Sequence, residues 1–168
     1  MIGAKPDERL RTPMQWSRGN AAGFTRGKPW QPLADDSLTT TVEAQDRDTS
    51  SLLALHRKLI HLRAANPALG HGRFVPLTAS HDAVVAYARR EGNRTVLVVA
   101  NLGDTALSGV TFTVADEALP AGSWSMRPLL GGTTGRLRID ADGKVEGVPG
   151  LQTLAPIEGY VFELTRSR

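Results

Sequence analysis

A helix is predicted where large apolar residues recur at spacings of three and four positions. The repeat consists of Leu52, Leu55, Leu59 and Leu62, and Leu53 and Ile60 widen its apolar face. This is the period of an amphipathic helix. Asp48 or Thr49 can cap the amino end, and Asn66 before Pro67 stops the helix, because a residue that precedes proline avoids the helical region. The pattern therefore predicts a helix over residues 49–65 with one apolar face.

Residues 71–168 show a different pattern, in which short apolar runs alternate with turn residues. The β-prone runs are 72–77, 84–89, 95–101, 110–114, 123–127, 136–139 and 159–164. Turn signals lie between them at Glu91-Gly92-Asn93, Gly131-Gly132 and Asp142-Gly143. Short, evenly spaced strands favour a mainly β fold, an antiparallel β-sandwich rather than a parallel sheet. Val96–Ala100 is apolar on both faces and is predicted to be the central strand.

Residues 1–48 have no sustained period and are rich in Gly, Pro, Asp and Thr, so they are predicted to form long loops. Three large rings, Trp16, Phe24 and Trp30, lie in this segment. Large rings on irregular backbone are expected where a loop packs against something or lines a site. A loop of this length is uncommon in a compact domain. The segment is therefore either functional or part of a larger body that supports it.

Composition excludes several classes of protein. The net charge is +3 and no basic block occurs, so a nucleic-acid partner is not expected. The absence of cysteine excludes disulfides and thiolate metal sites. No apolar run approaches the roughly 20 residues of a membrane span, and Lys5–Arg9 is charged where a signal peptide would be apolar. A soluble, cytoplasmic protein is expected, although a fragment can lose its targeting signal.

Candidate chemistry is weak outside the aromatic loop. The histidines fit surface or half-buried structural positions better than metal ligands; they are His56, His61, His71 and His81. The carboxylate pairs Asp35-Asp36 and Asp46/Asp48 fit turns and caps better than acid–base catalysis, which needs two flanking carboxyl groups. The glycine-rich segment 131–135 fits a hairpin loop rather than a phosphate loop. We expect no metal and no cofactor.

The aromatic loop and the helix carry motifs that resemble a known family. In order, they are Arg11-Thr12-Pro13-Met14-Gln15-Trp16, Ala22-Gly23-Phe24-Thr25, Pro29-Trp30, Val42-Glu43-Ala44-Gln45, Ser50-Ser51-Leu52-Leu53 and Arg57-Lys58-Leu59-Ile60-His61-Leu62-Arg63. They resemble the carboxyl-terminal part of α-amylase-superfamily glycoside hydrolases, in the branch of α-glucosidases, oligo-1,6-glucosidases and trehalose synthases. The β region is similar to that family's domain C.

The resemblance implies that only part of such an enzyme is present. Members are retaining enzymes built on a (β/α)₈ barrel, whose catalytic carboxylates precede the matched segment. Met1-Ile2-Gly3 resembles the end of the family's Glu-Glu-x-Gly-Met stretch, and Ser80-His81-Asp82 does not match its Asn-His-Asp motif. No catalytic residue is therefore assigned. Residues 1–68 are expected to be the loop and last helix of a truncated catalytic barrel, and residues 69–168 domain C.

One site residue carries over from the resemblance. Arg11 matches an arginine that pairs with an aspartate at the bottom of the glucose pocket, and a guanidinium suits a carboxylate and neighbouring hydroxyls. The rings of the loop are interpreted as packing rather than as sugar platforms.

The expected function of the chain is to complete the glucose pocket of an α-glucoside-acting enzyme and to stabilise its barrel. The expected partner is therefore the missing barrel, with the α-glucoside bound only in that context. The apolar face of the helix could instead form a homodimer, and residues 1–45 are expected to need a partner for order. The alternative function is a non-catalytic β-sandwich module that binds carbohydrate or a protein.

Overall fold

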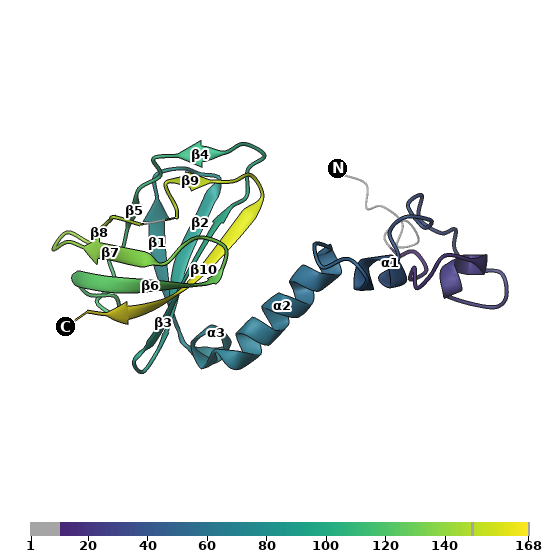
Figure 1. The fold of residues 1–168 in the computed structure, drawn as a ribbon, viewed down its shortest axis with the longest axis horizontal. Helices are drawn as coiled ribbons and strands as arrows, with labels where there is room; N and C mark the ends of the chain where they lie inside the picture. Colours follow the sequence, from purple (N-terminus) through teal and green to yellow (C-terminus); the bar gives the residue numbers. More distant parts are fainter. Residues whose placement is uncertain (1–10, 149, 168) are drawn as a thin grey trace, which may run out of the picture. The chain divides into compact units, whose positions relative to one another are not determined.

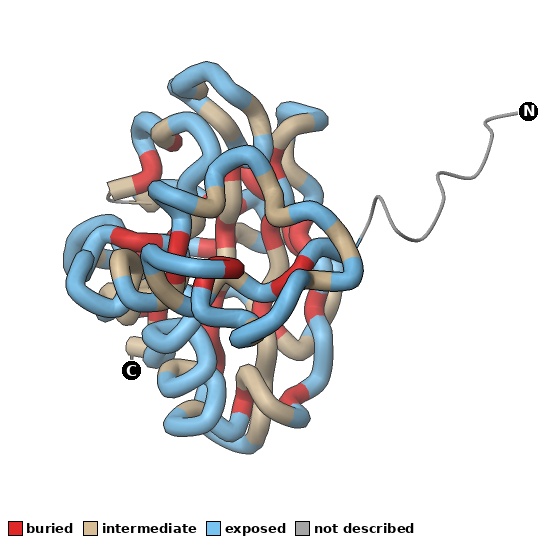
Figure 2. Tube along the Cα trace, turned by 90° about the vertical axis from the view of Figure 1, so that its right-hand side faces the viewer, coloured by how far each residue is buried: buried red, intermediate tan, exposed pale blue. Residues whose placement is uncertain are grey.

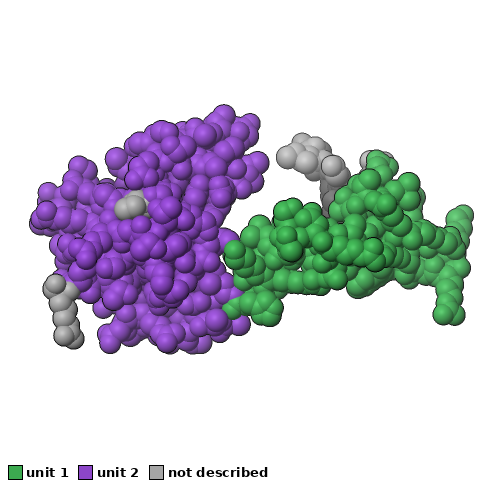
Figure 3. Space-filling view, viewed as in Figure 1, with its two compact units in different colours: residues 1–61 green, residues 62–168 purple. Residues whose placement is uncertain are grey.

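The structure is a computed structural model that describes residues 11–148 and 150–167 (Figure 1). The chain divides into two compact units, residues 1–61 and residues 62–168 (Figure 3). The predicted boundary after residue 68, between a catalytic barrel and a domain C, stays a prediction. Within the described segments, no helix is both long and apolar enough to cross a membrane.

The first unit is largely irregular, as the composition of residues 1–48 predicts. It contains a short 3₁₀ turn, η2 (Asn20–Gly23), and a five-residue helix, α1 (Val42–Asp46). The buried Thr41 caps α1, because its hydroxyl oxygen accepts a hydrogen bond from the backbone N–H of Ala44 at 3.1 Å. Hydrophobic periodicity does not reveal α1, because five residues make less than two helical turns.

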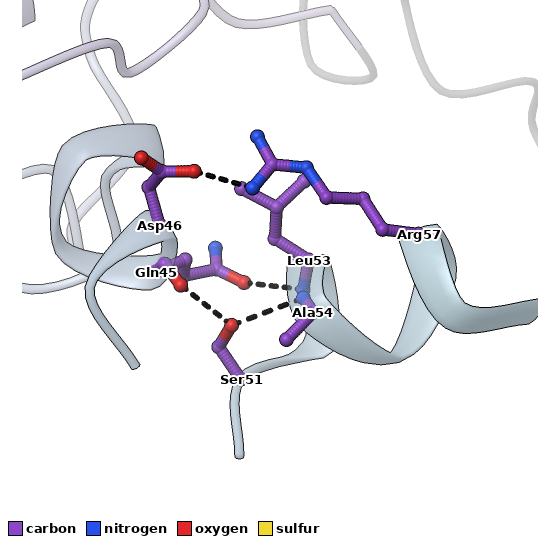
Figure 4. A network of polar contacts seen from close by, with 6 residues as sticks. All are labelled: Gln45, Asp46, Ser51, Leu53, Ala54 and Arg57. Carbon is purple, nitrogen blue, oxygen red and sulfur yellow. Dashed lines mark hydrogen bonds and ion pairs between the residues drawn. The ribbon is translucent and has the colours of Figure 1, made fainter. Parts of the chain in front are cut away.

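The predicted leucine-rich helix is confirmed as α2 (Leu52–Ala65), but its cap is neither Asp48 nor Thr49. The hydroxyl oxygen of Ser51 accepts a hydrogen bond from Ala54 N–H at 3.1 Å, and this hydroxyl donates to the backbone oxygen of Gln45 at 2.7 Å (Figure 4). The side-chain oxygen of Gln45 accepts from Leu53 N–H at 3.0 Å. Two side chains thus satisfy N–H groups at the start of α2 and join it to α1.

The second unit is mainly β, as predicted. A short helix, α3 (Pro67–His71), precedes the strands. The strands are β1 (Arg73–Ala79), β2 (Val84–Glu91), β3 (Arg94–Asn101), β4 (Leu107–Ser108), β5 (Phe112–Thr113), β6 (Gly122–Leu130), β7 (Gly135–Ile139), β8 (Lys144–Glu146), β9 (Thr153–Leu154) and β10 (Glu158–Arg166). Each β-prone run of the sequence overlaps one of these strands, and the three additional strands β4, β8 and β9 have no more than three residues each.

The strands close into a barrel, which differs from the predicted antiparallel β-sandwich. The order around the barrel is β1-β2-β3-β10-β6-β7-β8-β5, and β4 pairs with β9 outside it. Closure depends on β5, which pairs with β1 through Thr78↔Thr113 and Ala79↔Phe112 and with β8 on its other side. Because β5 has two residues and β8 has three, the pairings that close the barrel leave almost no periodic signal in the sequence.

The strand predicted to be central is β3, which lies between β2 and β10; in a closed barrel every strand has two neighbours, so none is central. The two apolar faces of β3 have different partners. Leu97 and Val99 belong to the barrel core, whereas Val96 packs with Ala68 of α3 and Val161 of β10 on the outer side. Figure 2 shows in red how the buried positions recur along the strands. The segment Val96–Ala100 is therefore apolar on both faces, because α3 covers the outer face of β3.

Candidate substrate-contacting loop

Arg11 is the first residue that the structure describes, and it lies on backbone without regular secondary structure. Its side chain is exposed. The role in glucose binding that the resemblance implies is not tested by this geometry and stays a prediction. Met1-Ile2-Gly3, which resembles the end of a barrel-strand motif, lies outside the described residues.

The backbone a few residues after Arg11 is anchored to the start of α1. The carbonyl oxygen of Gln15 accepts from Val42 N–H at 2.9 Å, and that of Trp16 accepts from Glu43 N–H at 3.0 Å. The side-chain amide of Gln15 also donates to the backbone oxygen of Thr40 at 2.5 Å. These bonds satisfy N–H groups that the first turn of a helix leaves unpaired. The loop that carries Arg11 is thus attached to a regular element.

A tight turn follows Trp16. The carbonyl oxygen of Ala22 accepts from Trp16 N–H at 2.9 Å, and that of Ala21 accepts from Phe24 N–H at 2.9 Å. Ala21 and Ala22 are buried and have φ angles of 50° and 51°. The left-handed conformation costs a non-glycine residue about 1–2 kcal/mol, and it persists where surrounding contacts impose it. The turn is therefore a constrained element that holds Trp16 and Phe24 at its two ends.

The three large rings of the loop are exposed in this chain. The exposed fraction is 51% for Trp16, 41% for Phe24 and 63% for Trp30. The interpretation of the three rings as packing residues therefore stays a prediction. It requires that the rings pack against a further surface, which they do not contact in this structure.

Trp30 also lines an open hollow of about 830 Å³. Among the described residues, Arg26 and Lys28 contribute to its wall and no carboxylate does. An indole ring with two cations nearby can contact a polar, ring-shaped ligand through stacking and hydrogen bonds.

Three carboxylates of the first unit, Asp36, Asp46 and Asp48, have side-chain or backbone partners. Asp36 accepts from the Gln15 side chain at 3.3 Å, and Asp46 forms an ion pair with Arg57. The Ser50 hydroxyl and then its backbone N–H, at 2.6 and 2.8 Å from Asp48, hold the pKa of that carboxyl below its ordinary value. The Asp48 contact agrees with a turn position, whereas Asp46 forms an ion pair rather than a cap.

The four histidines are exposed, in agreement with their predicted surface positions. Across residues 11–148 and 150–167, no three His, Asp or Glu side chains converge in a way that could hold a metal ion.

Most aromatic residues of the barrel are buried; they are Phe112, Trp124, Tyr160 and Phe162. Tyr87 is half-buried and lies against Phe74, which the sequence does not single out. The sequence alone does not show on which face of the sheet a single phenylalanine lies, because this depends on the register of the strand.

The comparisons with known proteins agree with the loop motifs. Residues 2–72 match the family of the α-amylase catalytic domain. The chain is thus homologous to α-amylase-family enzymes and corresponds to a fragment of them.

Individual relatives show how small this fragment is. Trehalose-6-phosphate hydrolase of Bacillus subtilis is 30% identical over 166 residues, which are 99% of this chain and 27% of that enzyme. Oligo-1,6-glucosidase of Bacillus cereus is 33% identical over 100 residues, or 60% of this chain and 18% of that enzyme. Among solved structures, isomaltulose synthase of Klebsiella sp. LX3 matches with a TM-score of 0.67 and 28% identity, over 91% of this chain and 25% of that one.

Proposed function

We propose that these 168 residues supply one wall of the substrate pocket, the last barrel helix and the β domain of an enzyme that acts on α-glucosides. The proposal rests on how much of this chain, and how much of its relatives, the sequence matches cover. Residues 2–72 match a catalytic-domain family, yet the whole chain spans 27% of a relative that aligns with nearly all of it. The names of the relatives refer to trehalose 6-phosphate and 1,6-linked glucosides, which supports α-glucosides as the substrate class.

The proposed partner is the remainder of an α-amylase-type barrel, and the proposed contact is the apolar face of α2. Leu52, Leu55 and Leu59 lie on this face and are exposed. Contiguous apolar surface of this kind marks a contact site. Catalysis by a retaining glycosidase needs two flanking carboxyl groups, and Asp36, Asp46 and Asp48 are engaged in hydrogen bonds and an ion pair. The chain therefore needs the remainder of the barrel for activity.

Association with a barrel tests this proposal. The barrel part is Bacillus subtilis trehalose-6-phosphate hydrolase without the segment that aligns with this chain. We expect sedimentation velocity to show a one-to-one complex, and Leu59→Glu to weaken it by about tenfold or more. His61→Glu, on the opposite side of α2, is the matched control.

The relative's own removed segment serves as a positive control for a competent barrel. If that segment binds and this chain does not, the proposal is wrong. A homodimer formed through the same face, with no complex, would also contradict it.

Arg11 is proposed to contact the substrate in this complex. Because a guanidinium offers paired donors that an ammonium lacks, Arg11→Ala should lower kcat/KM by about tenfold or more, and Arg11→Lys should recover only part of the loss. The measurement is the rate of p-nitrophenyl α-D-glucopyranoside hydrolysis by the complex. Arg18→Ala, at another exposed arginine of the loop, is the control. Equal losses for Arg11→Ala and Arg18→Ala would contradict the assignment.

A further inference from the structure

The outer face of β1 and β2 carries a pair of aromatic rings, the exposed Phe74 and the half-buried Tyr87. The ring centroids of Phe74 and Tyr87 are 5.2 Å apart, with 33° between the ring planes. The register pairs Phe74 with Arg89 and Pro76 with Tyr87, so the two rings are diagonal neighbours across the strands. Phe74 is 53% exposed. The rings thus form a surface outside the barrel core.

Charged side chains lie near the rings in both strands. Arg89, two residues after Tyr87 in β2, donates through Nε to the backbone oxygen of Ala68 at 3.3 Å. Arg73, next to Phe74 at the start of β1, forms an ion pair with Asp116 at 2.9 Å. Both arginines are therefore held by a partner.

A hollow of about 480 Å³ adjoins the ring pair along β1. Its lining includes Pro76 and Thr78, which share the outer face of β1 with Phe74 because side chains alternate along a strand. Asp116 and Glu117 also line this hollow. Because Pro76 lines the hollow and pairs with Tyr87, a polar lining lies next to the strand face that carries the rings.

We propose that this face binds α-linked glucose oligosaccharides, with one sugar ring on Phe74 and Tyr87 and the hydroxyls of the next ring in the hollow. A sugar ring has an apolar face for stacking and a rim of hydroxyls, so it matches an aromatic surface beside convergent polar groups. The choice of α-linked glucose rests on the proposed function. The core of a protein interface is depleted of charged residues, which makes a protein a poorer match for a surface that includes Arg73, Asp116 and Glu117.

The test is affinity electrophoresis of the full chain in native gels that contain amylopectin. We expect amylopectin to retard the chain, and Phe74→Ala to weaken the binding by about tenfold or more. Leu102→Ala is the matched control, because Leu102 is a large apolar residue that is 67% exposed elsewhere on the same unit. This control should migrate like the wild type.

A second variant keeps the proposal falsifiable if Phe74→Ala perturbs the fold. Glu117→Gln leaves the rings in place and should weaken binding by a few-fold, because it replaces a charged acceptor by a neutral one. The proposal is overturned if amylopectin does not retard the wild type, if Phe74→Ala is retarded equally, or if gels with hydroxyethyl cellulose retard the chain as strongly. A dimer that Phe74→Ala dissociates would overturn it as well.

These readouts involve no turnover and no barrel partner. Loss of retardation therefore leaves the proposed enzyme function intact, and failure of the chain to bind a barrel leaves the glucan site intact.

Discussion

Tyr160 shows how a single side chain fixes the end of the barrel where β10 begins. Its buried hydroxyl accepts a hydrogen bond from Ala155 N–H at 2.9 Å and donates to the carboxylate of Glu158 at 3.2 Å. Between these two residues, Ile157 has a φ of 52°, a conformation that a β-branched residue rarely adopts. Tyr160 therefore holds a strained turn in place. Its burial raises the pKa of the phenol, the hydrogen bond from Ala155 opposes this rise, and the negative charge of Glu158 adds to it.

The raised pKa predicts how stability depends on pH. In the unfolded chain the phenol ionises near pH 10, whereas the folded chain retains the proton to higher pH. The stabilisation is therefore complete below about pH 10 and is lost as the pH rises through the folded-state pKa. Tyr160→Phe should lower the free energy of unfolding at pH 7 by about 1 kcal/mol. Urea denaturation should show this difference shrinking above pH 10, and a difference that stays constant would contradict the account.

At the scale of elements, the start of α2 depends on side chains from outside the helix. Ser51 caps it, and Gln45 of α1 accepts a hydrogen bond from Leu53 N–H. The sequence predicts the helix itself, because its leucines repeat with a helical period. It does not distinguish Ser51 from the neighbouring residues with capping side chains, since several such residues precede the first leucine. Likewise, the long strands and β5 lie in predicted runs, whereas the three-residue β8 does not. The pairing of β5 with β1 and β8 closes the barrel, and β-prone runs do not reveal which strands pair.

Replacing the cap should have a measurable effect on α2. Ser51→Ala removes the acceptor for Ala54 N–H, so it should destabilise the helix by about 1 kcal/mol. Thr49→Ala, at an exposed position that the sequence also offers as a cap, should change stability by less than about 0.5 kcal/mol. Thermal denaturation followed by circular dichroism at 222 nm measures both variants. Equal effects of the two substitutions would show that Ser51 is not the cap.

At the scale of the whole molecule, the two units have different cores. Residues 62–168 contain a closed barrel with a continuous buried cluster, whereas residues 11–61 contain short helices and loops with exposed rings. The candidate site, with Arg11 and the exposed rings, belongs to residues 11–61. Arg11 is found only through the resemblance of its motif, because an arginine on irregular backbone gives no signal of its own. Its aspartate partner is expected in the remainder of a barrel, which local pattern cannot reveal.

This difference predicts the order of proteolysis. Trypsin should cleave the free chain first before residue 45, at the exposed Arg18, Arg26 or Lys28, because loops with few buried contacts open at low cost. A product that contains residues 62–168 should persist. Mass spectrometry of a digestion time course identifies the sites. First cuts within the barrel strands, or none before residue 45 in a monomer, would contradict the division.

The most direct test of the central claim is restored catalysis. Hydrolysis of p-nitrophenyl α-D-glucopyranoside is measured for this chain alone, for the truncated Bacillus subtilis barrel alone, and for their mixture. We predict activity in the mixture that greatly exceeds the sum of the separate samples, because the chain completes the pocket and the barrel supplies the carboxylates. An inactive mixture, in a preparation whose barrel is reactivated by its own removed segment, would contradict the account, as would full activity of this chain alone.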